Sequence, residues 1–505
     1  MQEYLHSLWQ VFQIHEISPA TNIINIRNII IINMFRKFVD RAEELNSLEK
    51  EYTNGGFSFT VIYGRRRIGK TELITHYIRD KPHIYFLADH RGTSTNVERF
   101  RKRAADFFDD FEPRVEGFDD VFEYIAKKWD REEKLVVAID EFSYLVQQDG
   151  SIPSVFQLIT DEILRERPVH LILCGSSISM MEKSTLAHSS PLYGRRTGQI
   201  QTKPIPFRHI QQFFPDISLE ECMQIYGVTG GIPYYLLFFD PEKEFAANLE
   251  NNVFATDAVL YEEGDFLLRE ELREPATFMN ILYAIATGAS RPAEIATRAY
   301  LQPKDISYYL KILMKLGFVS RQHPIADKPA TKKTIYRLED NFLRFWFRFV
   351  LPHKDELEPG NVVPVLEDIK KNYDRFLGMT FEDVGKETLI HLNSAGKLPF
   401  TFRKIGRQWG KIAAAARGKN DYEIDLVALN AESRDILFCE CKWQKQKVGP
   451  DVYYSLKEKG GFVDWHSEGQ KHFALISRAG FTPRMREIAE EEKVILIGLA
   501  DMIKG

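Results

Sequence analysis

The chain has 505 residues, of which 44% are hydrophobic and 28% are charged, as is typical of an ordinary multidomain protein. Its formal net charge of −5 excludes a global positive field, so binding to nucleic acid or to a membrane would need local patches. Four cysteines exclude a disulfide scaffold and indicate a reducing, cytoplasmic compartment.

The first 34 residues do not fit a folded domain. The most apolar stretch, TNIINIRNIIIIN, is interrupted by asparagines and by Arg27, so it predicts neither a membrane helix nor a signal peptide. A convincing amphipathic segment begins directly after it, at Met34. We therefore interpret residues 1–34 as an extension or a mispredicted start, and we expect no membrane partner.

Strands alternate with helices over residues 35–207. Near-continuous apolar strands with intervening helices predict a parallel sheet that is covered on both faces. The strands are expected at 57–64, 83–88, 134–142 and 169–177, and helices at 67–79, 97–109 and 153–166.

The middle of the chain is mainly helical. We interpret residues 208–265 as a helical lid on the sheet domain, and residues 266–351 as a winged helix, because three short helices precede a hairpin. The helices are expected at 275–286, 291–298 and 303–316, and the two strands at 318–322 and 333–339.

The last part of the chain returns to an α/β pattern. Residues 352–364 have the composition of a linker, and residues 365–505 read as one further α/β domain. The fold class predicted for the chain is therefore multidomain α/β. The C-terminal elements are expected at 368–391, 399–404, 422–429, 435–442, 451–458, 472–477, 482–491 and 494–498.

Residues 64–71 read GRRRIGKT, which is the G-x4-G-K-T motif of a P-loop. The motif follows a predicted strand and opens a predicted helix, where backbone N–H groups can surround phosphates. We expect Lys70 to reach the β- and γ-phosphates and to be catalytic, and Thr71 to bind Mg²⁺. The predicted nucleotide-binding residues are Gly64, Arg65, Arg66, Arg67, Ile68, Gly69, Lys70, Thr71, Glu72 and Asp140.

The run LVVAIDEF places two acids at the end of the third strand, where a parallel sheet meets its ligand. Asp140 is expected to hold Mg²⁺, and Glu141 to orient or deprotonate the attacking water. Ser176 or Ser177, at the end of the next strand, could sense the γ-phosphate, with a plain turn as the alternative. Arg195 and Arg196, in LYGRRTGQI, could reach the γ-phosphate, with a solvated basic turn as the alternative. The family resemblance given in the next paragraph favours Arg195 as the catalytic residue.

These pieces, in this order, resemble the archaeal-type ATPases of the STAND class of P-loop NTPases. The similarity covers residues 34–505 and includes FVDRAEELNSLE, VTGGIPYYLL and YRLEDNFLRFWFRFV as well as the P-loop. It implies a P-loop sheet, lid and winged helix that act as a switch driven by ATP. The choice of ATP over GTP comes from the resemblance alone, and the P-loop arginines offer a way to sense a neighbouring subunit in a homo-oligomer.

The third helix of the predicted winged helix has an apolar stripe and a polar face. The polar face and the wing could contact DNA phosphates, and a plain packing module is the alternative. The polar residues are Lys304, Ser307, Tyr308, Lys311, Lys315, Arg321, Lys328, Lys332 and Lys333.

The segment DYEIDLVALNAESRDILFCECKW reads as a hairpin with charged residues in its strands. If Asp425 lies opposite Glu440, the two carboxylates are about 5 Å apart on one face, and Glu423 lies opposite Lys442. Burying two carboxylates together is costly unless a cation or hydrogen bonds compensate. The alternation therefore favours a divalent-metal site on this hairpin over the alternative, a solvated hairpin.

An Asp followed by Glu-x-Lys on the next strand resembles the PD-(D/E)xK nuclease fold, which is also called restriction-endonuclease-like. The resemblance implies that Asp425 and Glu440 bind Mg²⁺ or Mn²⁺, and that Lys442 positions the attacking water or stabilises charge. Glu382, in TFEDVGKE, matches the acidic metal ligand on the preceding helix. The proline of the motif is absent, because Ile424 precedes Asp425.

Residues 396–420 carry seven positive charges and no acid, which favours a groove for a nucleic-acid backbone over a solvated loop. The predicted function is an ATP-hydrolysing switch with a nuclease-like domain directed at DNA. The alternative is an ATP-dependent signalling or DNA-binding scaffold that has lost cleavage. The seven residues are Lys397, Arg403, Lys404, Arg407, Lys411, Arg417 and Lys419.

Overall fold

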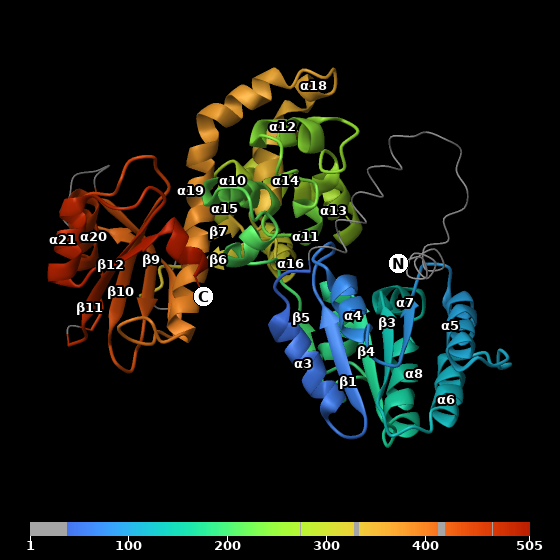
Figure 1. Cartoon of the computed structure of the whole chain (residues 1–505). Helices are drawn as coiled ribbons and strands as arrows, with labels where there is room; N and C mark the ends of the chain where they lie inside the picture. The colour runs from blue at the N-terminus through green and yellow to red at the C-terminus, as the bar shows by residue number, and fades with distance from the viewer. Residues whose placement is uncertain (1–37, 273, 328–332, 413–419, 467, 505) are drawn as a thin grey trace. The chain divides into compact units, whose positions relative to one another are not determined.

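The computed structural model describes residues 38–272, 274–327, 333–412, 420–466 and 468–504 (Figure 1). Helices within these ranges are all too short or too polar to cross a membrane. Several predictions lie outside the described residues. They concern the extension 1–34 and the basic residues Lys328, Lys332, Arg417 and Lys419.

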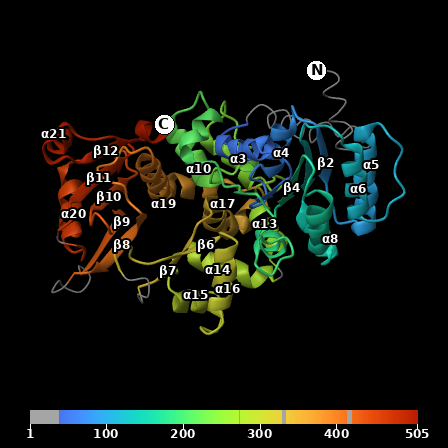
Figure 2. The same ribbon diagram turned by 90° about the horizontal axis from the view of Figure 1, so that it is seen from below.

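A five-stranded parallel sheet forms the first α/β unit, with the strand order β2-β3-β4-β1-β5. Its three central strands are buried along their whole length, because helices lie on both faces of the sheet (Figures 1 and 2). The strands are β1 (Ser58–Tyr63), β2 (His83–Leu87), β3 (Leu135–Asp140), β4 (Val169–Gly175) and β5 (Gly198–Gln201), and the helices are α3 (Ala42–Thr53), α4 (Lys70–Ile78), α5 (Thr93–Phe108), α6 (Phe118–Lys128), α7 (Phe142–Gln148), α8 (Ile152–Leu158) and α9 (Ile178–Met181).

The first α/β unit has elements that the sequence did not predict, among them β5, α6, α7 and α9. Strand β5 has the sequence GQIQ, and only Ile200 is buried in it, so an alternating apolar pattern could not reveal it. Helix α6 packs Phe118 and Phe122 into one hydrophobic core with Phe100 of α5 and Phe156 of α8. This aromatic core fixes the sheet whose strand ends carry the predicted nucleotide site.

The middle of the chain contains the three helices and the hairpin that the sequence predicted. Helix α16 buries Ile306, Leu310 and Leu313, while Tyr308 and Lys311 on its polar face are exposed. The elements are α10 (Leu219–Thr229), α11 (Pro233–Leu236), α12 (Phe245–Leu249), α13 (Glu263–Glu271), α14 (Pro275–Ala286), α15 (Pro292–Arg298), α16 (Ile306–Lys315), β6 (Val319–Gln322), β7 (Ile335–Leu338) and α17 (Asn341–Phe345).

The stretch expected to be a linker contains helical turns. Helix α18 (Lys354–Leu357) follows a 3-10 turn at Leu351–His353, and helix α19 (Val363–Ser394) begins before the predicted residue 368. Pro364 lies in the first turn of α19, where a backbone N–H has no helical partner, so it starts the helix without a lost hydrogen bond. Pro364 thus marks the start of a helix in the stretch that was expected to be a linker.

The C-terminal unit is a second five-stranded sheet, with the order β12-β11-β10-β9-β8. Strands β8, β9 and β10 are antiparallel, whereas β10, β11 and β12 are parallel. Helices α19 and α20 both contact β10, at Cys441 and at Phe438 respectively. The elements are β8 (Lys404–Lys411), β9 (Asp421–Leu429), β10 (Ile436–Lys442), α20 (Pro450–Gly461), β11 (Lys471–Ser477), α21 (Pro483–Glu492) and β12 (Ile495–Gly498).

Strand β8 lies after the predicted range 399–404. Its sequence KIGRQWGK has two glycines and few apolar residues, so it carries a weak strand signal. Both glycines lie where a neighbour approaches closely: a Cβ at Gly406 would be 3.3 Å from Ile325, and one at Gly410 would be 2.7 Å from the ring of Tyr422. Contacts with distant residues, which a local pattern does not encode, therefore place this strand.

Candidate functional site

The P-loop connects β1 to α4, as the motif predicted. Gly69 has φ +83° and precedes Lys70, the first residue of α4. This backbone conformation favours glycine, because a Cβ would be strained there. The Lys70 ammonium donates to the carbonyl oxygens of Gly64 at 3.0 Å and Arg65 at 2.8 Å, so the loop curls around its own lysine.

Thr71 and Asp140 meet at the end of this loop. The Thr71 hydroxyl donates to the Asp140 carboxylate at 2.7 Å, and the hydroxyl of Tyr85 donates to the same oxygen at 3.0 Å. Asp140 is buried, with 1% of its surface exposed. A hydroxyl beside a carboxylate fits Mg²⁺, which takes hard oxygen ligands next to nucleotide phosphates. Sequence reasoning missed Tyr85, since only the pairing of β2 with β3 places it there.

Glu141, the predicted base, directly follows Asp140 and has φ +54°, an uncommon conformation for a residue with a side chain. Its backbone N–H donates to Asp140 Oδ1 at 2.9 Å. Its carboxylate accepts hydrogen bonds from Ser176, from the hydroxyl at 2.8 Å and from the N–H at 3.3 Å. The structure thus brings together the predicted base and one of the two predicted sensor serines.

Arg195 does not join this group. Its guanidinium donates to the two oxygens of Asp161 at 2.8 and 2.7 Å and to the carbonyl of Pro191 at 2.6 Å. This fork-to-fork geometry holds the side chain firmly on the segment that follows α8. Its role in hydrolysis stays a prediction.

Arg41 supports the P-loop from outside and was not predicted as a site residue. Its guanidinium donates to the carbonyl of Ile68 at 3.0 Å and to the carbonyl of Lys203 at 2.9 Å. It is almost fully buried, with 6% exposed. One planar side chain therefore ties the loop to the segment that directly follows β5, and its place in FVDRAEELNSLE was the available sequence signal.

The three arginines of the P-loop are all engaged in ion pairs with acids from the middle of the chain. They thereby connect the loop to α13 and to the residue that precedes α17. Arg65 pairs with Asp340, Arg66 pairs with Glu270 at 3.0 Å, and Arg67 pairs with Glu263.

The second candidate site lies on β9 and β10. The two strands pair in the predicted register as far as Cys439 opposite Leu426, and the ladder ends there. One further step would place Asp425 opposite Glu440, but the Asp425 carboxylate accepts a hydrogen bond from the N–H of Cys441 at 2.9 Å. The two acids are neighbours, yet they do not form a regular cross-strand pair.

A bulge in β9 explains this departure. Against β8, Gly406 pairs with Val427 and Gln408 pairs with Ile424, so three steps along β9 match two along β8. The extra residue lies at 425–426, opposite the middle of β8. Bulges of this kind bend a strand and redirect its side chains, and they are frequent beside active sites.

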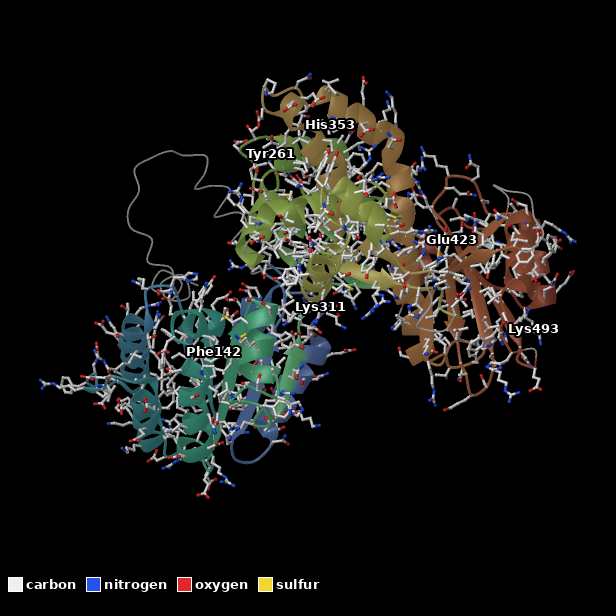
Figure 3. All side chains as sticks on the ribbon, turned by 180° about the vertical axis from the view of Figure 1, so that it is seen from behind. Phe142, Tyr261, Lys311, His353, Glu423 and Lys493 are labelled. Atoms are coloured by element: carbon white, nitrogen blue, oxygen red, sulfur yellow. The ribbon has the colours of Figure 1, made fainter. Side chains whose placement is uncertain are left out.

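The bulge corrects the predicted faces of β9. Glu423, Asp425 and Val427 were expected to share one face, but Ile424 and Val427 lie in the same hydrophobic core. The extra residue reverses the alternation between them. Glu423 (Figure 3) pairs with Arg407 at 2.6 Å rather than with the lysine predicted opposite it.

Glu440 is the most deeply buried acid of this site, with 5% exposed. One of its oxygens accepts hydrogen bonds from the ammonium groups of Lys442 at 2.8 Å and Lys459 at 3.1 Å. The other oxygen, Oε2, is buried and has no hydrogen-bond partner among the described residues. An unpaired buried carboxylate oxygen is costly, so a further cation would stabilise it. Lys459, on α20, was not predicted.

Glu382 lies on α19 and completes the predicted set of acids. Its carboxylate is 3.2 Å from the guanidinium of Arg407 and 3.8 Å from that of Arg337. Burial raises the pKa of Glu382 to about 7; Arg407 opposes this rise, and the nearby charge of Asp425 adds to it. Arg407 was predicted only as part of a basic groove.

Asp425 interacts electrostatically with both of the other acids, Glu382 and Glu440. Burial raises the pKa of Asp425 to about 6, and repulsion from the Glu440 carboxylate adds to the rise. Among the described residues, no three His, Cys, Asp or Glu side chains are arranged to hold a metal ion. The structure therefore gathers Glu382, Asp425, Glu440 and Lys442 in one place but does not complete a ligand set.

The predicted basic groove is partly neutralised by acids from other segments. Arg403 pairs with Glu432 at 2.7 Å and Lys411 pairs with Asp421 at 2.7 Å. With Arg407 paired as described above, at least three of the seven positive side chains are already in ion pairs. Their attraction for a phosphate backbone is correspondingly weaker.

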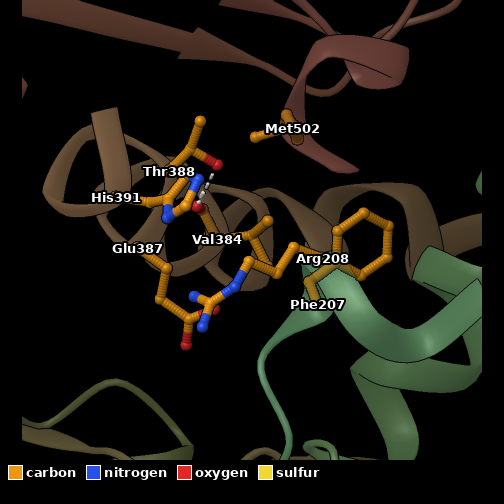
Figure 4. A pocket seen from close by; sticks show the side chains of 7 residues that line it. All are labelled: Phe207, Arg208, Val384, Glu387, Thr388, His391 and Met502. Carbon is orange, nitrogen blue, oxygen red and sulfur yellow. Dashed lines mark hydrogen bonds between the residues drawn. The ribbon is translucent and has the colours of Figure 1, made fainter. Parts of the chain in front are cut away.

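A small hollow lies between α19 and the segment that precedes α10 (Figure 4). Its volume of about 10 Å³ is too small for a substrate and amounts to one water at most. It contains none of the predicted site residues. The lining residues are Phe207, Arg208, Val384, Glu387, Thr388, His391 and Met502.

Comparison with known proteins assigns the family. Residues 38–239 match a family described as ATPase domains predominantly from Archaea. An uncharacterised protein of Methanocaldococcus jannaschii is 38% identical over 446 residues, which are 87% of this chain and 95% of that protein. The chain belongs to the archaeal ATPase family. Residues 346–452 of the chain also match a family described as archaeal and bacterial proteins of unknown function.

Solved structures show more distant similarity. A Walker-type ATPase of Pyrococcus abyssi is 21% identical, with 62% of this chain and 96% of that chain covered and a TM-score of 0.48. The ORC2 protein of Aeropyrum pernix, solved in ADPNP and ADP complexes, is 15% identical, with 66% and 95% covered and a TM-score of 0.43. A STAND protein of Pyrococcus horikoshii is 17% identical, with 66% and 45% covered and a TM-score of 0.30. The family assignment rests on the sequence matches.

Proposed function

We propose that this archaeal ATPase hydrolyses ATP with Mg²⁺ and works as a STAND-type switch. The contact between Thr71 and Asp140, at 2.7 Å beside the P-loop, is the observation that carries the proposal. These two residues would hold Mg²⁺, which when bound neutralises charge on the phosphates. Lys70 would bind the β- and γ-phosphates, and Glu141 would orient the attacking water or take its proton.

The replacement Lys70→Ala tests the ATPase proposal. It removes the ammonium that lies within the curled loop, so ATP turnover should fall to background in a phosphate-release assay. Lys50→Ala, which changes a lysine near the end of α3, is the control and should keep wild-type turnover. Unchanged turnover in Lys70→Ala would remove the assignment of the P-loop as the catalytic site.

We infer that residues 266–351 form a winged helix whose polar face contacts DNA. Tyr308 and Lys311 are exposed on α16, where they could reach phosphates. Lys311 is labelled in Figure 3. Lys315 pairs with Glu182 at 3.1 Å, so it is partly committed to a contact within the chain. Lys311→Glu should therefore weaken binding to a DNA duplex, and a salt titration would register the lost phosphate contact.

We further propose that the C-terminal domain, residues 365–505, is a metal-dependent nuclease of the PD-(D/E)xK type that acts on DNA. The unpaired, buried Oε2 of Glu440 is the observation that supports a metal here. Asp425, Glu440 and Glu382 would hold Mg²⁺ or Mn²⁺, which when bound would polarise the scissile phosphate. Lys442, hydrogen-bonded to Glu440 at 2.8 Å, would position the attacking water or stabilise developing charge.

A second candidate function is a scaffold that signals or binds DNA without cutting it. It is favoured by the protein's own cations, since Arg407 and Arg337 face Glu382 while Lys442 and Lys459 bind Glu440. Cations of the protein reduce the need for a metal ion. In this second candidate function, the C-terminal domain would keep its α/β fold although its catalytic chemistry is lost.

Calorimetric titration of Mn²⁺ onto the full chain separates the two functions. A nuclease should bind the metal at a site that Glu440→Gln removes, while metal binding at the P-loop is measured separately with ATP present. The matched control Glu432→Gln changes an exposed acid that only pairs with Arg403. No heat beyond the P-loop site would favour the scaffold.

Assembly and location belong to the same proposal. We infer that ATP binding could join copies of the chain into a homo-oligomer, because Arg195 or a P-loop arginine could reach a neighbouring nucleotide. Light scattering with and without a nonhydrolysable ATP analogue measures this directly, and an unchanged mass would favour a monomeric switch.

The four cysteines are free and buried, which supports a reducing, cytoplasmic location.

A further inference from the structure

The β6–β7 hairpin is attached to the P-loop at its base. Phe318 immediately precedes β6, and the guanidinium of Arg65 lies 4.8 Å from the centre of its ring. Asp340 follows β7 after one intervening residue, and it forms an ion pair with the same guanidinium. One P-loop side chain therefore contacts both ends of the hairpin, and Asp340 is 6% exposed.

The body of the hairpin is attached to the helix that carries Glu382. Arg337 of β7 donates to the Asp383 carboxylate at 3.1 Å and to the carbonyl of Met379 at 3.0 Å. Its guanidinium is also 3.8 Å from Glu382, the acid predicted to bind metal. Arg337 is 9% exposed, so these contacts are largely shielded from water.

Helix α17, which begins directly after Asp340, forms a second connection between Asp340 and helix α19. Asp340 accepts a hydrogen bond from the N–H of Leu343 at 2.6 Å and thereby caps the first turn of α17. Arg344 in that helix donates to Asp383 at 2.8 Å. Arg337, before Asp340, and Arg344, after it, therefore both donate hydrogen bonds to the Asp383 carboxylate of α19.

The loop of the hairpin is hydrogen-bonded to β8, the strand that lies beside the candidate metal site. The N–H of Ile325 donates to the carbonyl of Arg407 at 3.0 Å, and the N–H of Ala326 donates to the side chain of Gln408 at 3.0 Å. These β8 residues lie opposite the bulge at 425–426. The guanidinium of Arg407, in turn, faces Glu382.

We propose that the β6–β7 hairpin couples the nucleotide at the P-loop to the C-terminal site, with Arg337 and Arg407 as positioning residues for Glu382. A triphosphate beside Arg65 competes with Asp340 for the guanidinium and changes the contact at the base of the hairpin. A two-stranded hairpin moves as one element, so its far end shifts against α19 and β8. The inference rests on the proposed ATP site and names the regulation of the proposed nuclease site.

Hydrogen exchange of the full chain, with and without Mg²⁺ and a nonhydrolysable ATP analogue, tests the coupling. We expect the analogue to change the exchange rate of the amides in β8 by about threefold or more in the wild type. Asp340→Asn should reduce this response to less than about half while the analogue still binds, as a fluorescent ATP analogue would report. Asp265→Asn, which removes an ion pair to Arg269 within α13, should respond like the wild type.

Arg337 is tested by rescue. Arg337→Met should abolish the response of β8 to the analogue, and Arg337→Lys should restore part of it, because a cation near Glu382 is retained. A purely structural role would lower the unfolding temperature in both variants and leave the response of the folded protein intact.

Two outcomes would overturn the coupling: a wild type that binds the analogue with no change in β8, or an Asp340→Asn variant with the full response. The nuclease proposal fails separately. A clear response of β8 without any DNA cleavage would leave the coupling in place and remove the nuclease, and cleavage without a response would do the reverse.

Discussion

At the scale of single residues, Glu141 has a strained backbone conformation of the kind that is frequent at active sites. Its positive φ of +54° is unusual for a residue with a side chain, and such a conformation costs about 1–3 kcal/mol. The hydrogen bonds from Ser176 and to Asp140 keep it in place. Strain beside a residue pair that fits Mg²⁺ is the arrangement expected of a catalytic carboxylate.

The replacement Glu141→Gln keeps the shape of the side chain and removes its capacity to take a proton. ATP should still bind, and turnover should fall by about 100-fold or more, the usual contribution of a general base. Single-turnover hydrolysis and equilibrium binding would be measured on the same sample. Glu166→Gln, an exposed acid that follows α8, is the control. Turnover within a factor of about two of the wild type would contradict the assignment.

Arg41 acts on the P-loop through the backbone. Arg41→Lys keeps the charge but loses the planar fork that binds the carbonyls of Ile68 and Lys203. Leaving a buried carbonyl unpaired costs about 1–3 kcal/mol, so affinity for a fluorescent ATP analogue should fall about 10-fold. Arg79→Lys, at an exposed position after α4, should bind normally. Equal affinities in the two variants would show that Arg41 does not shape the loop.

At the scale of helices and strands, elements with a strong local pattern could be predicted and elements defined by distant contacts could not. Helix α14 has the predicted bounds, because its apolar positions and Pro275 are local signals. Strand β5 and strand β8 lack such a pattern, and β8 is positioned by Ile325 and by the ring of Tyr422.

The hairpin of β9 and β10 shows the same division inside the candidate site. The register could be predicted from alternation, since it depends only on which residues share a face. The bulge at 425–426 could not be predicted, because it is defined by the pairing of β9 with β8. The sequence pattern had placed that strand at 399–404 instead of Lys404–Lys411. The sequence therefore predicted Asp425, Glu440 and Lys442 as candidate site residues, but it did not predict their geometry or that Arg407 and Lys459 lie beside them.

Helix α19 offers a matched test of how the C-terminal sheet is packed. A Cβ at Gly385 would lie 3.0 Å from Cys441 Sγ and 3.0 Å from Ile476, whereas one at Gly378 meets nothing within 4 Å. Gly385→Ala should destabilise the protein by about 1–3 kcal/mol through overpacking. Gly378→Ala should stabilise it by about 0.5–1 kcal/mol through helix propensity. Urea unfolding measures both, and shifts of the same sign would contradict this packing.

At the scale of the whole molecule, ion pairs join residues that are far apart in the sequence. Arg65 and Asp340 are 275 positions apart in the sequence, and no local pattern predicts that they meet. That the triple arginine lies beside the triphosphate stays a prediction, whereas its acidic partners on α13 and before α17 emerged only from the structure. These partners connect the P-loop to the middle of the chain.

Nicking of supercoiled plasmid DNA by the full chain, with Mn²⁺ and ATP, tests the central claim most directly. The wild type should convert the plasmid to the nicked form, and Asp425→Ala or Lys442→Ala should abolish the conversion. Asp421→Ala, an exposed acid of the same strand that pairs with Lys411 at 2.7 Å, should cut like the wild type. A wild-type protein that turns over ATP yet leaves the plasmid intact would contradict the nuclease and favour the scaffold.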